Sequence, residues 1–248
     1  MSVAVGALAA SESKRLFRSP LAWIVLALGE GFMAVFFMLL VVRYLENEAA
    51  LRASGVTNAV LVPYFTAANL GMLLVAPLLT MNAIAGERRD GTLRFLYSTP
   101  LGALDIVGGK LGGVLGLAGA YVLLVVMMPA TLFWGTPLDA GVYAANVLGL
   151  ALFTLMHVSL GLMCSALTRQ PVAAALVALV VSLALWLLDW AVRLDPAASH
   201  VGAYATLARL RGFSLGLVSS ADIAWFVLAS LLFLALTALL VDADRSLA

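Results

Sequence analysis

Six long apolar runs are the feature that most constrains how this chain folds. A helix needs roughly 20 apolar residues to cross a hydrocarbon core of about 30 Å, and each run reaches that length. Only 11% of the 248 residues are charged, against roughly 25% in an ordinary soluble domain. The sequence therefore predicts an all-α membrane protein in which residues 1–248 form one domain. We place its six spans at residues 21–42, 62–85, 106–133, 142–167, 172–194 and 222–241.

The connections on both sides of the fourth run are short. The stretch "WGTPLDAG" (134–141) combines an interfacial aromatic residue, Trp134, with turn formers, which predicts a hairpin loop between the third and fourth spans. Pro171 suits the first turn of a helix, so we expect the fifth span to begin there.

The basic residues predict the orientation of the chain. With a cytoplasmic N-terminus, nine of the 14 Lys and Arg residues face the cytoplasm and five face the other side, as the positive-inside rule favours. Both termini are then cytoplasmic. Before the first span, apolar residues such as Leu8 and Leu16 accompany the basic residues Lys14, Arg15 and Arg18, which predicts a helix lying in the membrane interface, with a disordered tail as the alternative. The net charge of +1 indicates no attraction to nucleic acid.

The segment "GERRDGTLRFLYSTPLGALDIVGGK" (86–110) interrupts the apolar pattern between the second and third spans. Gly91 predicts an interruption of the helix, and Thr92 predicts the N-cap of the next one. The apolar residues that follow predict a short helix ending before Pro100. A short amphipathic helix is suited to docking a partner protein. The residues leave a second reading open, in which Arg88 and the nearby basic residues are only a topology signal.

This segment resembles the coupling region of the permease subunits of type-2 ABC exporters. The match covers essentially the whole chain, with similarity to the gliding-motility (GldF-like) branch near "RLRGFSLGLVSSADIAWF" and to the nitrous-oxide-reductase maturation (NosY-like) branch. It departs from the family pattern at Arg88 and Arg89, where acidic residues are usual. The motif is carried by Glu87, Gly91, Thr92, Leu93, Leu96, Thr99, Pro100, Asp105, Ile106, Gly109 and Lys110.

The resemblance implies an architecture and a set of partners. It implies an N-terminal interfacial helix, a cytoplasmic coupling helix between spans two and three, and re-entrant segments between spans five and six. It also implies two copies of an ABC ATP-binding subunit, a second permease copy or a similar permease, and a bacterial inner membrane; an accessory periplasmic protein is a further partner that it allows. Leu93 to Leu96 would be the apolar part inserted into the ATPase. The implied ATPase-coupling residues are Glu87, Arg88, Arg89, Asp90, Gly91, Thr92, Leu93 and Leu96.

The energy source is expected in another chain. The nearest imitation of a P-loop, "LDIVGGKLG", lacks the first glycine and the hydroxyl residue that would bind magnesium. We therefore expect no catalytic residue and no cofactor here, with ATP and Mg bound by the partner ATPase.

Polar residues within the spans are the candidates for a translocation path or gate, because ionisable groups in a membrane are costly. Helical spacing places Asn69 on a polar face of the second span, and Asn146 and His157 on one of the fourth; such faces either bind helices together or line a cavity. Asp189 has a simple partner in Arg193, one turn away. The full candidate set is Glu30, Asn69, Asn146, His157, Arg211 and Phe213.

Two other classes compete with the permease. An intramembrane protease would need a Gly-x-Ser-Gly nucleophile or a His-Glu-x-x-His metal motif, whereas the sequence has only His157 and His200, far apart and suggesting no metal site. An ion-coupled secondary transporter using Glu30 and His157 is the alternative function that the sequence leaves open.

Overall fold

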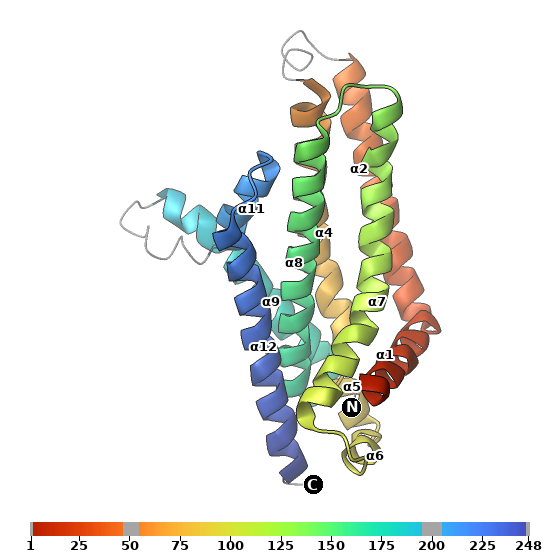
Figure 1. The fold of residues 1–248 in the computed structure, drawn as a ribbon. Helices are drawn as coiled ribbons and strands as arrows, with labels where there is room; N and C mark the ends of the chain where they lie inside the picture. The colour runs from red at the N-terminus through yellow and green to blue at the C-terminus, as the bar shows by residue number, and fades with distance from the viewer. Residues whose placement is uncertain (1, 47–54, 195–204, 247–248) are drawn as a thin grey trace.

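The computed structural model describes residues 2–46, 55–194 and 205–246. Within these residues, six helices are long and apolar enough to cross a membrane, which confirms the predicted number of spans. They pack lengthwise into one bundle (Figure 1). Their bounds are α2, Pro20–Glu46; α4, Val62–Thr80, preceded by the π-helical turn η1, Thr57–Leu61; α7, Ala103–Ala130; α8, Ala140–Leu167; α9, Pro171–Leu194; and α12, Ser220–Ser246.

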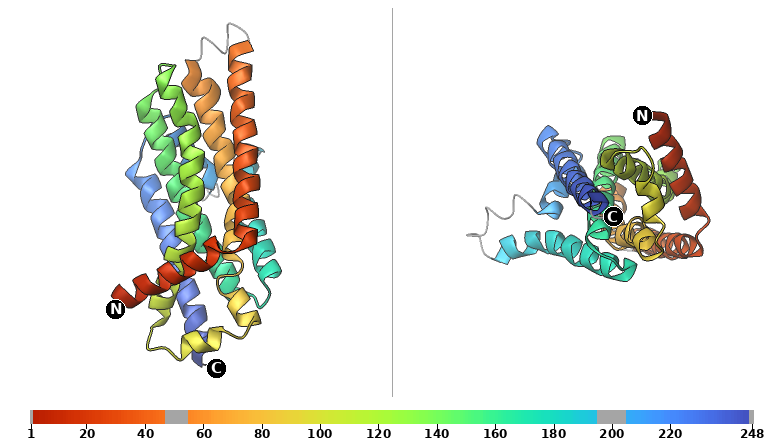
Figure 2. Two further views of the ribbon diagram at one scale, coloured as in Figure 1. Left: turned by 90° about the vertical axis from the view of Figure 1, so that its right-hand side faces the viewer. Right: turned by 90° about the horizontal axis from the view of Figure 1, so that it is seen from below.

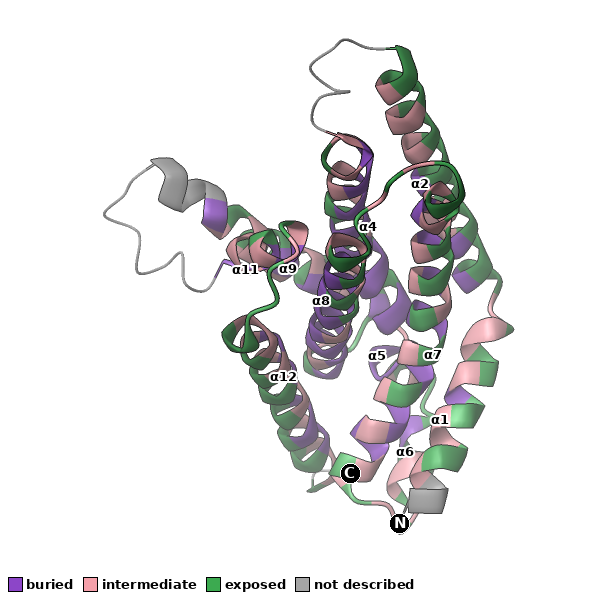
Figure 3. Ribbon diagram, turned by 45° about the horizontal axis from the view of Figure 1, so that its top comes forward, coloured by how far each residue is buried: buried purple, intermediate pink, exposed green. Residues whose placement is uncertain are grey.

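Helix α8 forms the centre of the bundle. Most of its residues are buried, and it contacts α4, α7, α9 and α12 (Figure 3). Small residues permit this close packing, since a Cβ atom at Gly161 would overlap the side chain of Thr80 on α4. The outer helices instead expose large apolar side chains, such as Leu28 on α2 and Leu239 on α12. This pattern suits a protein whose surrounding solvent is lipid.

Both chain termini lie at the same end of the bundle, which we call the terminal end (Figure 1). Helix α1, Ser2–Phe17, runs across the spans near this end rather than along them (Figure 2). The predicted N-terminal helix is therefore confirmed as a helix. Two short helices, α5 (Ala85–Arg89) and α6 (Leu93–Tyr97), lie at the same end, between α4 and α7.

The opposite end carries the predicted hairpin between the third and fourth spans. A 3₁₀ turn, η2 (Thr131–Trp134), leads into α8, whose first amides donate to Asp139 Oδ1 from Gly141 N (2.8 Å) and Val142 N (3.1 Å). This is the side-chain cap expected at a helix N-terminus. Helix α9 begins at Pro171, as predicted.

Helix α11, Thr206–Ser214, lies beside α8 rather than beyond its end. It contacts α8 at Asn146 and Gly149, about 9 to 14 Å along the helix from Ala140 at 1.5 Å per residue. This part of the predicted connection therefore folds back along the bundle. Residues 195–204 of the same connection lie outside the described residues, and the depth of α11 in a bilayer stays a prediction.

Candidate functional site

The charged segment between α4 and α7 folds as two short helices, which we call the α5–α6 element (residues 85–97). Gly91 separates them with φ +74°, a backbone conformation that favours glycine. The predicted interruption of the helix at Gly91 is confirmed. Thr92 occupies the predicted N-cap position of α6, but its backbone is helical rather than extended and its side chain makes no cap. Its hydroxyl instead donates weakly to the carbonyl of Glu87 (3.4 Å).

Arg88 fixes the α5–α6 element to the ends of two spans. Its Nη1 donates to the carbonyl oxygens of Ala166 (2.9 Å) and Thr168 (2.7 Å), where α8 ends, and its Nη2 pairs with Asp244 near the end of α12. A cation at a helix C-terminus satisfies carbonyls that have no partner within the helix. Arg88 is therefore a structural anchor as well as a basic residue at the terminal end.

Two further contacts hold the same region. The Ser165 hydroxyl accepts from the amides of Ile84 (3.1 Å) and Ala85 (3.0 Å) and donates to the carbonyl of Met81 (3.0 Å), which satisfies the chain as it passes from α4 to α5. Arg245 of α12 donates to the carbonyl of Leu101 (2.8 Å), in the connection from α6 to α7. Helices α8 and α12 thus both hold the chain between α4 and α7 in place.

A cluster of four charged residues joins the α5–α6 element to α1 and α7; we call it the interfacial ion cluster. At its centre, Lys110 of α7 lies with Nζ 2.8 Å from Glu12 Oε1 and 2.7 Å from Glu87 Oε2. Arg15 of α1 bridges the same two acids, at 2.8 Å from Glu12 and 3.1 Å from Glu87. The side chain of Lys110 is 1% exposed, and those of Glu12 and Glu87 are 8% and 13% exposed.

Two cations facing two carboxylates make this burial tolerable, because each charge has a hydrogen-bonding counter-ion. Burial acts to raise the pKa of Glu12, but the charges of Lys110 and Arg15 outweigh it and hold that pKa below its ordinary value. Glu12 is therefore a carboxylate at neutral pH, and the ion pairs of the cluster hold α1, α5 and α7 together.

Glycines on α7 bring α1 close enough for these ion pairs. A Cβ atom at Gly109 would lie 2.6 Å from the Leu8 side chain, and one at Gly113 would overlap Glu12. Only glycine lets the two helix backbones approach this closely. The close packing of α1 on α7 thus determines where the Glu12 carboxylate lies.

The exposed surface of the α5–α6 element differs from the sequence interpretation. Leu93 is buried against Ile84, Val107 and neighbouring residues, and Leu96 packs against the same cluster. Leu93 is therefore part of the fold, whereas Leu96 is only partly buried, and a role of Leu96 in contacting the ATPase stays a prediction. The exposed residues of the element are Arg89, Asp90, Gly91, Thr92, Arg94 and Phe95, and Phe95 is 76% exposed.

The residues predicted to form a translocation path or gate lie in different parts of the structure. Asn146 of α8 donates to the carbonyl of Phe213 on α11 (3.2 Å), so the structure brings these two candidates together as a helix contact. The ring of Phe213 packs against Gly149 of α8. Arg211 donates to Asp189 of α9 (2.6 Å), which fixes α11 to α9; the side chain of Arg193, the predicted partner of Asp189, lies outside the described residues.

Two of the three remaining polar candidates, Asn69 and His157, lie inside the bundle and bond to their own helices. Asn69 donates to the carbonyl of Phe65 (2.9 Å) on its own helix. His157 is buried in α8, stacks on Phe153 with the ring centroids 3.8 Å apart, and has Nδ1 2.9 Å from the Phe153 carbonyl. His200 lies outside the described residues.

Glu30 of α2 differs from these residues, because both of its carboxyl oxygens are buried and neither has a hydrogen-bond partner among the described residues. It lies close enough to Tyr64 and Tyr121 to interact electrostatically with both. In the described part of the chain, no hydrogen bond or ion pair joins Glu30 to His157.

Sequence reasoning missed Glu12 and Tyr121, and it treated Lys110 as a motif and topology residue. One signal was available for Glu12: the glycine-rich face of α7 indicates a closely packed helix, and an acid on α1 is a natural partner for Lys110. Tyr121 offers no comparable signal, because a tyrosine in an apolar run is typical of a membrane helix.

The six apolar helices form a bundle, and the charged α5–α6 element is held at one end of it. This arrangement defines a multi-pass membrane protein that presents a polar surface outside its spans. Residues 6–194 match the family described as ABC-2 family transporter protein. The chain therefore belongs to the ABC-2 transporter family, whose members are membrane components of ABC transporters, and it is a permease subunit. Membership implies an ATP-binding partner. No curated protein matches this chain.

Proposed function

We propose that this chain is the membrane subunit of an ABC exporter and that a separate ATP-binding subunit drives it through the α5–α6 element. The ATP and its Mg ion would be bound by that partner. The observation that carries the proposal is the anchoring of the element: Glu87 and Arg88 tie it to α1, α7, α8 and α12. A displacement of this element would therefore be transmitted to several helices together.

The exposed face of the element supports a protein partner. Phe95 is exposed on the same element as the charged residues Arg89, Asp90 and Arg94. At interfaces an aromatic anchor fills a pocket of the partner, and charges orient that partner. Because the terminal end carries this face, we propose that it is cytoplasmic and that both termini are too. The basic residues of the sequence support the same orientation, in a bacterial inner membrane.

The proposed assembly has two permeases and two ATP-binding subunits, because an ATPase that closes as a dimer needs two membrane partners. The second permease would be another copy of this chain or a similar subunit. An accessory periplasmic protein, and membership of the gliding-motility or nitrous-oxide-reductase maturation branch, stay predictions from the sequence.

The test is co-purification of the detergent-solubilised chain with an ATP-binding subunit encoded beside it. We expect Phe95→Ala to weaken binding by about 2 kcal/mol, as expected for a buried aromatic anchor at an interface. The matched control is Phe133→Ala, the same change at an exposed phenylalanine of η2 at the opposite end. Equal retention of the ATPase by both variants would refute docking on the α5–α6 element.

The ion-coupled alternative has one observation in its favour, the unpartnered carboxyl group of Glu30. His157 gives it weaker support: its ring stacks on Phe153 and its Nδ1 lies 2.9 Å from the Phe153 carbonyl, while its buried Nε2 has no hydrogen-bond partner among the described residues. An ATP-independent, proton-driven flux in vesicles containing this chain alone would favour the alternative over the permease proposal.

A further inference from the structure

A cavity of about 410 Å³ lies at the corner where the chain turns from α1 into α2, and we call it the corner cavity. Its lining consists of Ser11, Lys14, Arg15, Arg18 and Ser19. The three basic residues follow Ser11 at intervals that place side chains on one face of a helix. No acidic residue lines the cavity in the described part of the chain.

The packing of α1 turns this basic face away from α7. The face that carries Leu8 and Glu12 packs on glycines of α7, and Leu16 packs against the main core. The residues of the basic face are exposed: Ser11, Lys14, Arg15 and Arg18. An anion can therefore reach these side chains without displacing the helix.

Two of the three cations have no counter-ion. Arg15 already pairs with the two carboxylates of the interfacial ion cluster, at 2.8 Å and 3.1 Å. Lys14 and Arg18 form no ion pair, and the hydroxyl of Ser19 forms no hydrogen bond, with any other described residue. The cavity thus offers two uncompensated positive charges and a free hydroxyl donor, which is the chemistry that binds a phosphate group.

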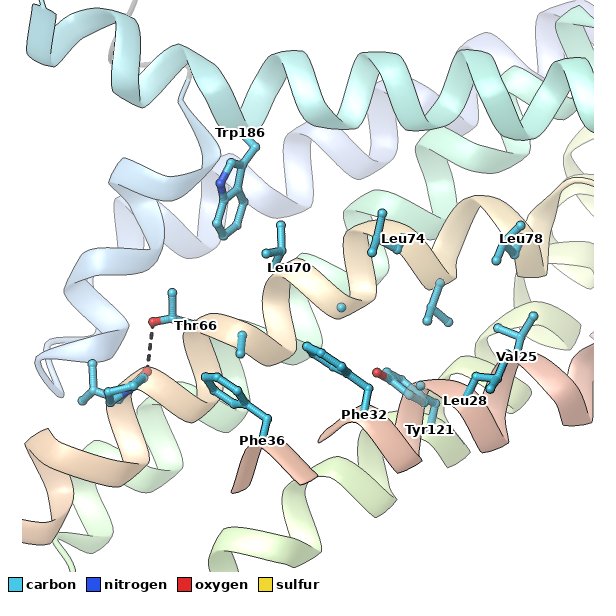
Figure 4. A pocket seen from close by; sticks show the side chains of 16 residues that line it. Val25, Leu28, Phe32, Phe36, Thr66, Leu70, Leu74, Leu78, Tyr121 and Trp186 are labelled. Atoms are coloured by element: carbon cyan, nitrogen blue, oxygen red, sulfur yellow. Dashed lines mark hydrogen bonds between the residues drawn. The ribbon is translucent and has the colours of Figure 1, made fainter. Parts of the chain in front are cut away.

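The corner cavity adjoins the surface that lipid contacts. Helix α1 crosses the spans near the terminal end and meets the start of α2 there (Figure 2). In the first turns of α2, Trp23 is 56% exposed and Ile24 is 58% exposed. Trp23 Nε1 donates to the carbonyl of Phe17 (2.7 Å), as suits a tryptophan at a membrane interface. Farther along α2, Leu28 and Phe32 line a largely apolar groove (Figure 4).

We propose that the corner cavity binds the phosphate of an anionic glycerophospholipid, whose acyl chains lie beside the exposed first turns of α2. Charge complementarity selects this occupant, because Lys14 and Arg18 lack counter-ions at the point where the lipid-facing surface of α2 begins. Basic pockets beside membrane helices are suited to anionic head groups. The inference goes beyond the proposed function, since it depends neither on the ATPase nor on the cargo.

The test is native mass spectrometry of the detergent-solubilised full chain, titrated with phosphatidylglycerol or phosphatidylcholine of the same acyl composition. Both lipids carry a phosphate, but only phosphatidylglycerol has a net negative charge. We expect saturable binding of phosphatidylglycerol with a Kd about tenfold below that of phosphatidylcholine, as for two exposed ion pairs.

Variants assign this preference to named residues. Lys14→Gln and Arg18→Gln should each weaken binding of phosphatidylglycerol by about threefold, and together they should remove the preference. The matched control is Arg169→Gln, the same change at an exposed arginine between α8 and α9 at the terminal end. We expect this variant to bind both lipids as the unaltered chain does.

Three results would overturn the proposal. Equal binding of the two lipids by the unaltered chain, which requires no variant, would mean that the cavity does not select a charged head group. Equal weakening by Arg18→Gln and Arg169→Gln would indicate a general attraction of basic residues rather than a site. Displacement of phosphatidylglycerol by an equal concentration of inorganic phosphate would assign the cavity to a soluble anion.

Discussion

Replacing Lys110 by methionine should destabilise the protein strongly. Lys110 is 1% exposed and is paired with Glu12 at 2.8 Å and Glu87 at 2.7 Å. Methionine preserves the length of the side chain but leaves two largely buried carboxylates, with only the partly exposed Arg15 remaining in the interfacial ion cluster. Removing one partner of a buried ion pair typically costs about 3–5 kcal/mol, and we expect a loss of unfolding free energy in this range.

The assay is equilibrium unfolding of the detergent-solubilised chain by increasing dodecyl sulfate, followed by circular dichroism. Lys14→Met is the matched control, because Lys14 is the other lysine of the sequence and is exposed on α1; we expect an effect within about 0.5 kcal/mol. Adding Glu12→Gln and Glu87→Gln to Lys110→Met should recover most of the loss, since no unpaired charge then remains buried. Equal effects of the two lysine variants would refute a stabilising role for the cluster.

Two further predictions concern α1 and its contact with α7. Gly113→Ala should lower the unfolding free energy by about 1–3 kcal/mol, because the added Cβ atom overlaps Glu12. In the control, Gly119→Ala on the same helix, the added Cβ atom meets no atom within 4 Å, so this change should raise the unfolding free energy by up to about 1 kcal/mol. Similar values for the two variants in the unfolding assay would contradict the packing argument. Because the folded pKa of Glu12 lies below its ordinary value of 4.5, its contribution to stability should be fully present above pH 4.5 and be lost as the pH falls through the folded pKa. Unfolding measured against pH for the unaltered chain and Glu12→Gln checks this, and a constant difference between them across the acidic range would contradict it.

The number of spans could be predicted from the sequence because the thickness of a bilayer sets the length of an apolar helix. The end of the second span could not, since α4 ends at Thr80 and the predicted run to residue 85 includes a turn and the start of α5. Gly91 could be identified as a break because its residue type permits a positive φ. The inward position of Leu93 could not be predicted, since a helix of five residues is too short for its apolar pattern to define one buried face.

The interfacial ion cluster was harder to predict than the fold. Lys110 and Glu12 are 98 residues apart in the sequence, and nothing local shows that α1 crosses α7 at this point. Hydropathy classifies Lys110 as a residue near the membrane surface, yet its side chain is almost wholly buried. The chemistry of the residues was visible in the sequence, but the helix crossing that brings them together depends on tertiary packing.

The anchoring of the α5–α6 element has a consequence for biosynthesis. The element lies in the first half of the chain, but Asp244 and Arg245, which hold Arg88 and the carbonyl of Leu101, lie at the end of α12. The last span must therefore be synthesised and inserted before these contacts can form. The surface proposed to receive the ATPase is completed only when every span is in the membrane, so a partly inserted chain would present an incomplete docking surface.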